Sequence, residues 1–478
     1  MFNKQSSKYV ILKRMMISFL TVIFVRLIYF IPVPGVRMVA LSDFYHKHIL
    51  AQGGSFFDLM GLLHFGKLRN LSIFSLGIMP FIHACLLVQV IGFLVPGGNR
   101  KFFSVKGTSH MMAIFTLIAA ILISAFHAYF IALDIELLNS FPSFNIISFE
   151  GFIFHLTTIL AVIGGSIILI IASEFINRFG LGNGVAVIFA SEILLRFVFA
   201  LDQVSVFYGR NLIDLTQLLL FSFVCLIFVY LTRYVTLFNR KIEFCSADEE
   251  KFFIRIRPLW IGVWPLIITE YILSFFEISL NIFSFLTVLL TCAAISLLYA
   301  KIIYQPRHFY EVLLARKCKA HKNQKKIIED NLNQAMLHCI FLSMILFMVM
   351  YYLPIILPSS LKISFLSSGM FGAFGLIVLV GLYYDMNDQI KFFRKIHKFP
   401  DINWQFLSIA QDEVHADVEK ACLRSHGIMA EVNPSHFNWG VPIRTIASGY
   451  SIYVSEKDKS RALSIINRMK SEWNERSI

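Results

Sequence analysis

Long apolar runs separated by polar connections dominate the chain. A helix needs about twenty mainly apolar residues to cross a bilayer, and windows of that length occur ten times. The pattern predicts an all-α polytopic membrane protein with ten transmembrane helices, and an even number leaves both termini on one side. The predicted spans cover residues 11–31, 71–95, 109–131, 151–173, 184–201, 213–235, 258–278, 282–303, 335–356 and 364–386.

The second run, residues 71–94, contains residues that a purely lipid-facing helix does not need. Gly77, Pro80, His83 and Gln89 interrupt the sequence LSIFSLGIMPFIHACLLVQVIGFL. Such residues inside a span usually pack against protein or line a path through the membrane. They would also suit a Pro-kinked buried helix in any polytopic protein, and the run alone does not decide between the two interpretations.

Lysine and arginine are concentrated in alternate connections. The N-terminal segment and residues 96–108, 174–183, 236–257 and 304–334 carry most of them, whereas residues 132–150 carry none. By the positive-inside rule, both termini are predicted to be cytoplasmic. The net charge of +13 is then explained mainly by membrane topology, so nucleic acid is not an expected partner.

Two connections are unusual. On the outer side, residues 54–65 (GSFFDLMGLLHF) are apolar but too short to cross, which fits either a re-entrant helix or a helix lying at the interface. On the inner side, the Lys-rich stretch after residue 315 fits either a topological anchor or a docking surface for a cytosolic partner. Its basic residues are Arg316, Lys317, Lys319, Lys322, Lys325 and Lys326.

The composition changes after the tenth predicted span. Lys391, Arg394, Lys395 and Lys398 form a basic strip that could lie against anionic lipid. From Pro400 on, the hydrophobic pattern predicts a strand, an amphipathic helix, two strands and a final helix. We therefore divide the chain into a ten-helix domain, residues 1–398, and a small cytosolic α+β domain, residues 399–478.

Composition excludes a soluble protein and gives little support to an enzyme. The chain is 57% hydrophobic and only 15% charged, with a mean hydropathy of +0.69. Polar groups placed in or near spans, His83, Glu174, Glu192 and Glu270, could suggest a protease or proton-coupled carrier. Yet none has the spacing of a metal site or nucleophile motif. Neither a catalytic residue nor a metal or other cofactor is predicted.

Glycines and prolines mark several predicted span starts. The sequence FGLGNGVAVIF, residues 179–189, places three glycines and Asn183 in a tight turn before the fifth span. The sequence IRPLWIGVWPLII, residues 256–268, places Gly262 and Pro265 inside the seventh span, where proline weakens the helix hydrogen bonds. Together these features describe helices able to bend or separate.

These motifs resemble the SecY family, the channel subunit of the Sec preprotein translocase. The similar sequences are RLIYFIPVPGV, LSIFSLGIMPFIHACLLVQ, LGNGVAVIF, IGVWPLII and GLIVLVGLYYDMNDQI, which occur in the family's order between residues 26 and 390. The stretch YQPRHFYEVL after the eighth span is also similar. The resemblance implies two pseudo-symmetric halves around a protein-conducting pore.

The resemblance also implies roles for individual residues. A ring of apolar side chains would close the pore at mid-membrane, the re-entrant piece at 54–65 would form a plug, and the second and seventh spans would form a lateral gate. The ring matches Ile82, Leu86, Val185, Phe189, Ile267 and Val378; the plug contains Gly54, Phe56, Phe57, Leu59, Leu62 and Leu63; the gate contains Gly77, Pro80, Gln89, Gly262 and Pro265.

The cytosolic loops depart from the family. The loop after the second span is short, the family's Ile-Pro-Gly-Ile-Arg-Pro-Gly motif is replaced by the Lys-rich stretch at 316–326, and Leu259 stands where the family has Asn. The resemblance implies SecE-type and SecG-type small membrane subunits as partners, with a SecA motor or ribosome on the basic loops. Besides the Lys-rich stretch, those loops contain Arg240, Lys241, Arg255 and Arg257.

The predicted function is a channel in the bacterial cytoplasmic (inner) membrane that translocates unfolded polypeptides and releases hydrophobic segments laterally into lipid. The altered loops favour a divergent or accessory copy. Two alternatives stay open: a small-molecule or ion transporter with the same helix count, and a channel-derived scaffold that acts through the C-terminal domain. A transporter would centre polar residues at mid-membrane, whereas the assigned ring is apolar.

Overall fold

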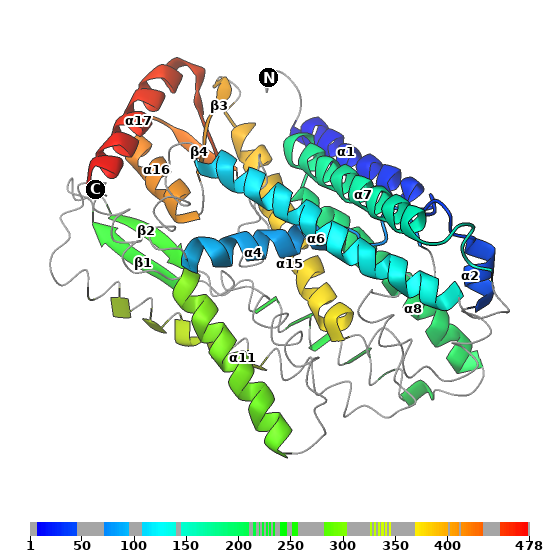
Figure 1. The fold of residues 1–478 in the computed structure, drawn as a ribbon. Coiled ribbons are helices and arrows are strands. Elements are labelled where there is room, and N and C mark those ends of the chain that lie inside the picture. The colour runs from blue at the N-terminus through cyan, green and yellow to red at the C-terminus, as the bar shows by residue number, and fades with distance from the viewer. Residues whose placement is uncertain are drawn as a thin grey trace. The chain divides into compact units, whose positions relative to one another are not determined.

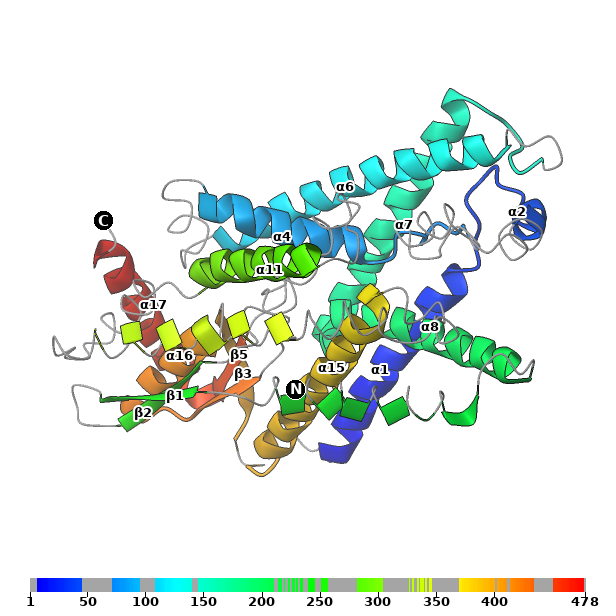
Figure 2. The same ribbon diagram turned by 90° about the horizontal axis from the view of Figure 1, so that it is seen from below.

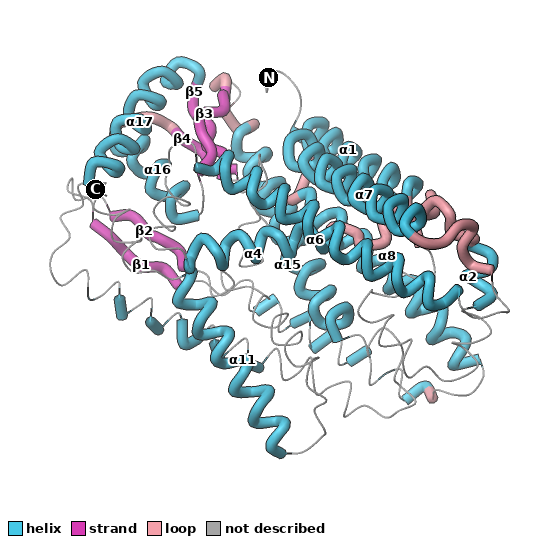
Figure 3. Tube along the Cα trace, in the orientation of Figure 1, coloured by secondary structure: helices cyan, strands magenta, loops and turns pink. Residues whose placement is uncertain are grey.

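Helices form most of the described chain in a computed structural model of the protein (Figures 1 and 3). The chain divides into two compact units, one mainly Lys13–Ser191 and the other mainly Glu192–Pro442 with Ser448–Ile478. The structure describes residues 7–44, 71–94, 108–139, 145–209, 240–245, 251–256, 282–303, 369–399, 402–410, 413–433 and 450–476, together with isolated positions within 214–234 and 326–345.

Seven long helices coincide with predicted spans. By length and composition, two segments of the described chain could cross a membrane, Ala113–Asn139 and Phe152–Phe179. Three predicted spans, 213–235, 258–278 and 335–356, lie wholly or largely outside the described residues, so the count of ten stays a prediction. The seven helices are α1 (Ser7–Ile28), α4 (Met79–Leu94), α6 (Thr108–Asn139), α7 (Phe152–Phe179), α8 (Gly184–Gly209), α11 (Ile282–Ile303) and α15 (Gly369–Ile396).

The second predicted span begins later than its hydrophobicity indicates. Residues 71–78 form turns, and α4 starts only at Met79. Gly77 adopts φ +57° just before the helix, and Pro80 lies in the first helical turn, where a missing N–H costs no hydrogen bond. Pro80 therefore lies at the start of α4 rather than at a kink within it.

The first unit is built around α6, which packs against both α4 and α7 (Figure 1). The segment after α1 pairs with the connections around it: Pro32 forms a β-bridge with Ser72, and Val36 forms one with Ile147. A short helix, α2 (Met38–Phe44), follows. Val33, Val36 and Ile147 are buried in one cluster with side chains of α6 and α7, so these connections are part of the packed core.

The C-terminal strands and helices follow the predicted order (Figure 3). The three strands form an antiparallel sheet with β5 in the centre, and side chains such as Leu407, Leu423 and Ile452 are buried together beneath it. We call residues 402–476 the C-terminal segment; that it is a separate domain from residue 399 stays a prediction. Its elements are β3 (Trp404–Ala410), α16 (Glu413–Ser425), β4 (Ala430–Asn433), β5 (Tyr450–Ser455), a 3-10 turn (Glu456–Asp458) and α17 (Lys459–Arg476).

One pair of strands was not predicted. β1 (Arg240–Cys245) and β2 (Lys251–Ile256) form an antiparallel hairpin in the basic inner connection between the sixth and seventh predicted spans. The hydrophobic pattern there is too short and too interrupted by charge to separate a hairpin from a solvated loop.

Candidate functional site

Five of the six predicted ring positions lie within the described residues. Ile82 and Leu86 are one helical turn apart on α4, and Val185 and Phe189 are one turn apart on α8. Ile82 is 2% exposed, and Val185 and Phe189 are 1% exposed each. Val378 on α15 is also buried, Leu86 is half-buried, and Ile267 lies outside the described residues. The assembled ring stays a prediction.

The glycine-rich turn predicted before the fifth span does start a helix. Asn183 caps α8, because its Oδ1 accepts hydrogen bonds from the backbone N–H groups of Val185 at 3.1 Å and Ala186 at 3.3 Å. Asn177, near the end of α7, accepts a third from the N–H of Gly184 at 2.7 Å. Three backbone donors at the start of α8 are thus satisfied by side chains inside an apolar environment, and the positions of Val185 and Phe189 follow from this cap.

Helix α1 holds the same turn from its other side. The hydroxyl of Ser18 donates a hydrogen bond to the carbonyl oxygen of Leu181 at 2.9 Å. The same hydroxyl accepts one from the backbone N–H of Leu181 at 2.8 Å. Arg14 donates to the carbonyl of Gly180 at 3.0 Å. Two residues beyond the ring position Phe189, Ser191 of α8 accepts a hydrogen bond from Arg26 at 2.6 Å. Polar contacts at the turn before α8 and at Ser191 therefore fix α8 against α1.

Two glycines let α7 approach the beginnings of α4 and α8. A Cβ at Gly165 would overlap the carbonyl oxygen of Ile73, in the turn before α4, and lie 2.7 Å from the carbonyl carbon. A Cβ at Gly184, the first residue of α8, would overlap the carbonyl oxygen of Ser173 on α7. Since Gly165 and Ser173 are eight residues apart, about 12 Å along the helix axis, α7 spaces the two helix starts.

The remaining predicted site residues are only partly described. Gly77 and Pro80 start α4, Gln89 lies within α4, and Gly262 and Pro265 lie outside the described residues, as do all six plug positions. Among the basic loop residues, Arg240 and Lys241 begin β1 and Arg255 lies in β2. Lys326 is an isolated helical position. The others are not described: Arg257, Arg316, Lys317, Lys319, Lys322 and Lys325.

Polar residues of the spans have ordinary partners. His83 on α4 lies beside His127 on α6, with ring centroids 6.3 Å apart, and Glu174 pairs with Arg178 one turn along α7 at 3.2 Å. Glu192 is buried, and Glu270 is outside the described residues. Within the described part of the chain, no three His, Cys, Asp or Glu residues are placed to hold a metal ion.

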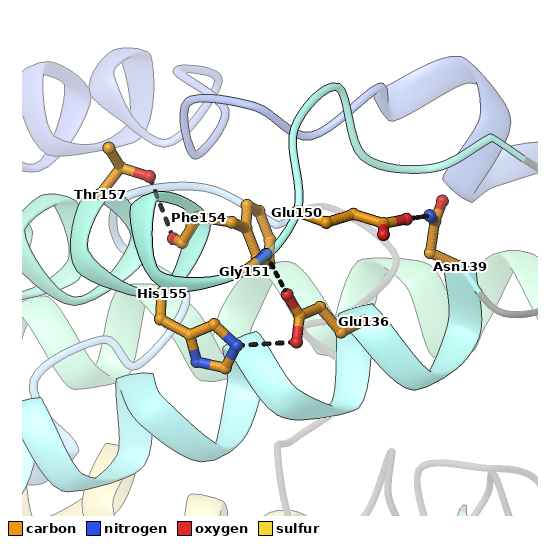
Figure 4. A network of polar contacts seen from close by, with 7 residues as sticks. All are labelled: Glu136, Asn139, Glu150, Gly151, Phe154, His155 and Thr157. Atoms are coloured by element: carbon orange, nitrogen blue, oxygen red, sulfur yellow. Dashed lines mark hydrogen bonds and ion pairs between the residues drawn. The ribbon is translucent and has the colours of Figure 1, made fainter.

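A polar cluster joins α6 to α7 where the two helices connect, and the sequence reasoning missed it (Figure 4). Glu136 accepts hydrogen bonds from the N–H of Gly151 at 2.7 Å and from Nε2 of His155 at 2.8 Å. Asn139 donates to Glu150 and accepts from the N–H of Ile146 at 2.7 Å. The cluster was missed because Glu136 was assigned to a connection and His155 to a span. A search for acid and base pairs across short connections could have found it.

The fold defines a class of protein before any particular family. Two helices of the described chain are long and apolar enough to cross a membrane, and the composition of the whole chain is that of a polytopic helical membrane protein. Two solved structures share the fold. One is described as "The structure of a protein conducting channel" and matches with a TM-score of 0.53 at 12% identity, over 80% of this chain and 93% of that one. The other concerns the plug domain of the SecY protein and matches with a TM-score of 0.51 at 11% identity, over 80% and 92%.

The chain belongs to the SecY family, because the sequence pattern that defines this family matches residues 72–387. The resemblance noted in the sequence is thus confirmed. Protein translocase subunits SecY are 30% identical over 190 residues in Rickettsia typhi and 27% identical over 186 residues in Buchnera aphidicola. These matches cover 39% of this chain and 42% and 41% of the relatives. The chain therefore spans less than half the length of the curated relatives that it matches.

Proposed function

We propose that this protein is a protein-conducting channel that translocates unfolded polypeptides across the bacterial cytoplasmic membrane. Membership of the SecY family supports the class. The single observation that carries the proposal is the apolar, buried character of the ring positions on α4, α8 and α15. A small-molecule transporter would instead present polar or charged groups at that depth.

Apolar side chains suit this task for a physical reason. A ring of aliphatic and aromatic groups offers no ligand to a hydrated ion, so it seals the resting channel, yet it has no fixed partner and can yield to any passing peptide. In our proposal the plug at 54–65 adds to the seal. The second and seventh spans separate so that a sufficiently hydrophobic segment leaves sideways into lipid, driven by burial of its side chains.

The rigid start of α8 also supports this role. Ser18, Asn177 and Asn183 tie its first turn to α1 and α7. The residues before α4 are held in another way, because Ser72 forms a β-bridge with Pro32 and Gly165 packs against Ile73. The starts of α4 and α8 are thus both fixed, which suits helices that hold ring side chains in place.

The protein itself carries out no bond chemistry in this proposal. SecE-type and SecG-type subunits would accompany it, and energy would come from a SecA motor, a ribosome or the membrane potential. Both termini would face the cytoplasm. The Lys-rich stretch at 316–326, which replaces a family motif, favours an accessory copy with restricted substrates. A strain that grows normally with this protein as its sole channel subunit would contradict that last point.

The test places a photocrosslinker at Ile82 or Ile267 and presents an arrested secretory chain. We expect crosslinks from both ring positions to the arrested chain. The matched control is Leu122, on the exposed side of α6, which should give none. Equal yields at Ile82 and Leu122, or no crosslink from either ring position, would contradict translocation and favour a scaffold.

A further inference from the structure

A buried carboxylate links the C-terminal segment to the end of α15. The side chain of Glu431 on β4 is 5% exposed. Its Oε1 forms an ion pair with Nζ of Lys395, at the end of α15, over 2.8 Å. Two cations of α16, Lys420 at 3.0 Å and Arg424 at 3.3 Å, contact the same carboxylate. One acidic group therefore joins three elements: the last helix of the membrane domain, α16 and β4.

The charge state of this cluster fits its geometry. Burial raises the pKa of Glu431, but the hydrogen bond from Lys395 and the charge of Lys420 outweigh burial, so the pKa lies below the usual value of 4.5. Burial lowers the pKa of Lys420, and the positive Arg424 and Lys395 nearby lower it further. At neutral pH the carboxylate is ionised and holds cations from both sides of the junction.

Apolar packing continues the junction one turn earlier on α15. Phe392 is buried and its ring lies 5.5 Å from that of Tyr453 on β5, centroid to centroid. Tyr453 in turn contacts Phe406 on β3 at 6.1 Å. The end of α15 thus contacts β4 and β5, and the basic strip that could lie against lipid gives Lys395 to this junction instead.

The same segment also contacts the β1–β2 hairpin. Helix α16 lies against β2, and two views of the fold show β1 and β2 beside α16 (Figures 1 and 2). A two-stranded hairpin is at best marginally stable alone and gains stability by packing against a helix. In the described chain, α16 provides that helix.

We propose that the C-terminal segment is an intramolecular partner of the β1–β2 hairpin, held against it by the Glu431 cluster. The segment binds the end of α15 with one surface and the hairpin with another, so release from α15 loosens the hairpin. Since the hairpin precedes the predicted seventh span, one side of the proposed lateral gate, and α15 carries Val378, the segment joins a gate element to a ring-bearing helix. That consequence rests on the proposed function, whereas the contact itself does not.

Hydrogen–deuterium exchange of the full chain in lipid nanodiscs tests the contact without any transport assay. Lys395→Met removes the ion pair between Glu431 and α15 and leaves the other two ion pairs in place, because Lys420 and Arg424 still neutralise Glu431. We expect amide exchange in β1, β2 and α16 to accelerate about two- to tenfold. The matched control is Lys391→Met, one turn earlier on α15 and paired only with Asp388 among the contacts described, which should leave exchange unchanged.

A second variant keeps the test decisive if one bond proves too weak to matter. Glu431→Gln leaves three cations around a neutral amide and should accelerate hairpin exchange about tenfold or more. If exchange in β5 and α17 also rises, the segment has unfolded, and Lys395→Met with Tyr453→Ala becomes the deciding variant. Hairpin exchange that stays at the Lys391→Met rate in every variant with a folded segment overturns the proposal.

Discussion

Replacing Gly165 by alanine should separate α7 from the turn before α4. The added Cβ would overlap Ile73 O, and it would lie 2.7 Å from the carbonyl carbon, where ordinary contact begins at 3.4 Å. The difference, 3.4 minus 2.7, requires the two backbones to move apart by at least about 0.7 Å. Neither atom can rotate away, because both belong to the main chain.

The neighbouring residue provides the matched control. A Cβ at Gly164 meets nothing within 4 Å, so Gly164→Ala only removes the conformational cost of glycine in a helix, a gain of up to about 1 kcal/mol. Gly165→Ala makes the same gain but must overcome backbone overlap, which costs about 1–3 kcal/mol or more. The two variants should therefore differ by about 2 kcal/mol, with Gly165→Ala the less stable.

The assay is the unfolding midpoint of the purified protein in detergent, measured for both variants and the parent chain. Gly164→Ala should match or exceed the parent midpoint, and Gly165→Ala should fall several degrees below it. If the two variants have equal midpoints, α7 does not approach residue 73 as described, and the argument that α7 spaces the two helix starts is refuted.

Two further outcomes follow from named contacts. Asn183→Ala should destabilise the start of α8 by about 1–2 kcal/mol, since the N–H groups of Val185 and Ala186 lose their acceptor. Asn183→Asp should recover that stability. An Ala variant as stable as the parent would contradict the cap. The pKa of Glu431 is depressed below 4.5, so its contribution to stability is fully present above that pH and is lost as pH falls through the folded-state value. The protection factors of the β4 amides, which correct for the pH dependence of intrinsic exchange, should fall on acidification in the parent but change less in Glu431→Gln, and identical pH profiles would exclude this role.

Much of the helical architecture could be predicted from residue pattern alone. Hydrophobic runs locate the starts of α1, α6, α7 and α8 to within four residues, because a run long enough to span the bilayer marks a helix whatever its neighbours. The observed ends of α6, α7 and α8 lie six to eight residues beyond the predicted ones. The order of elements after Pro400 follows for a similar reason, since alternation and helical periodicity are local properties. The cap at Asn183 was likewise visible as a turn signal ahead of an apolar run.

The departures from prediction arise where distant segments meet. Residues 71–78 are apolar enough for a helix, but they form turns, with Ser72 bridged to Pro32 and Gly165 packed against Ile73. The β1–β2 hairpin forms with α16 lying against it, although α16 follows it by more than a hundred and fifty residues. Local pattern contains no information about such partners.

The sequence by itself determined the class of protein, the apolar chemistry of the predicted pore and the family. These depend on composition and on motifs that can be read along the chain. Only the tertiary structure decided that Pro80 begins a helix, that Glu136 pairs with His155, and that Lys395 binds Glu431 rather than remaining a free basic residue. Each of these depends on a contact between residues distant in sequence. Such a contact stabilises the protein only after folding has met the entropy cost of bringing the two segments together, so the local pattern does not reveal it.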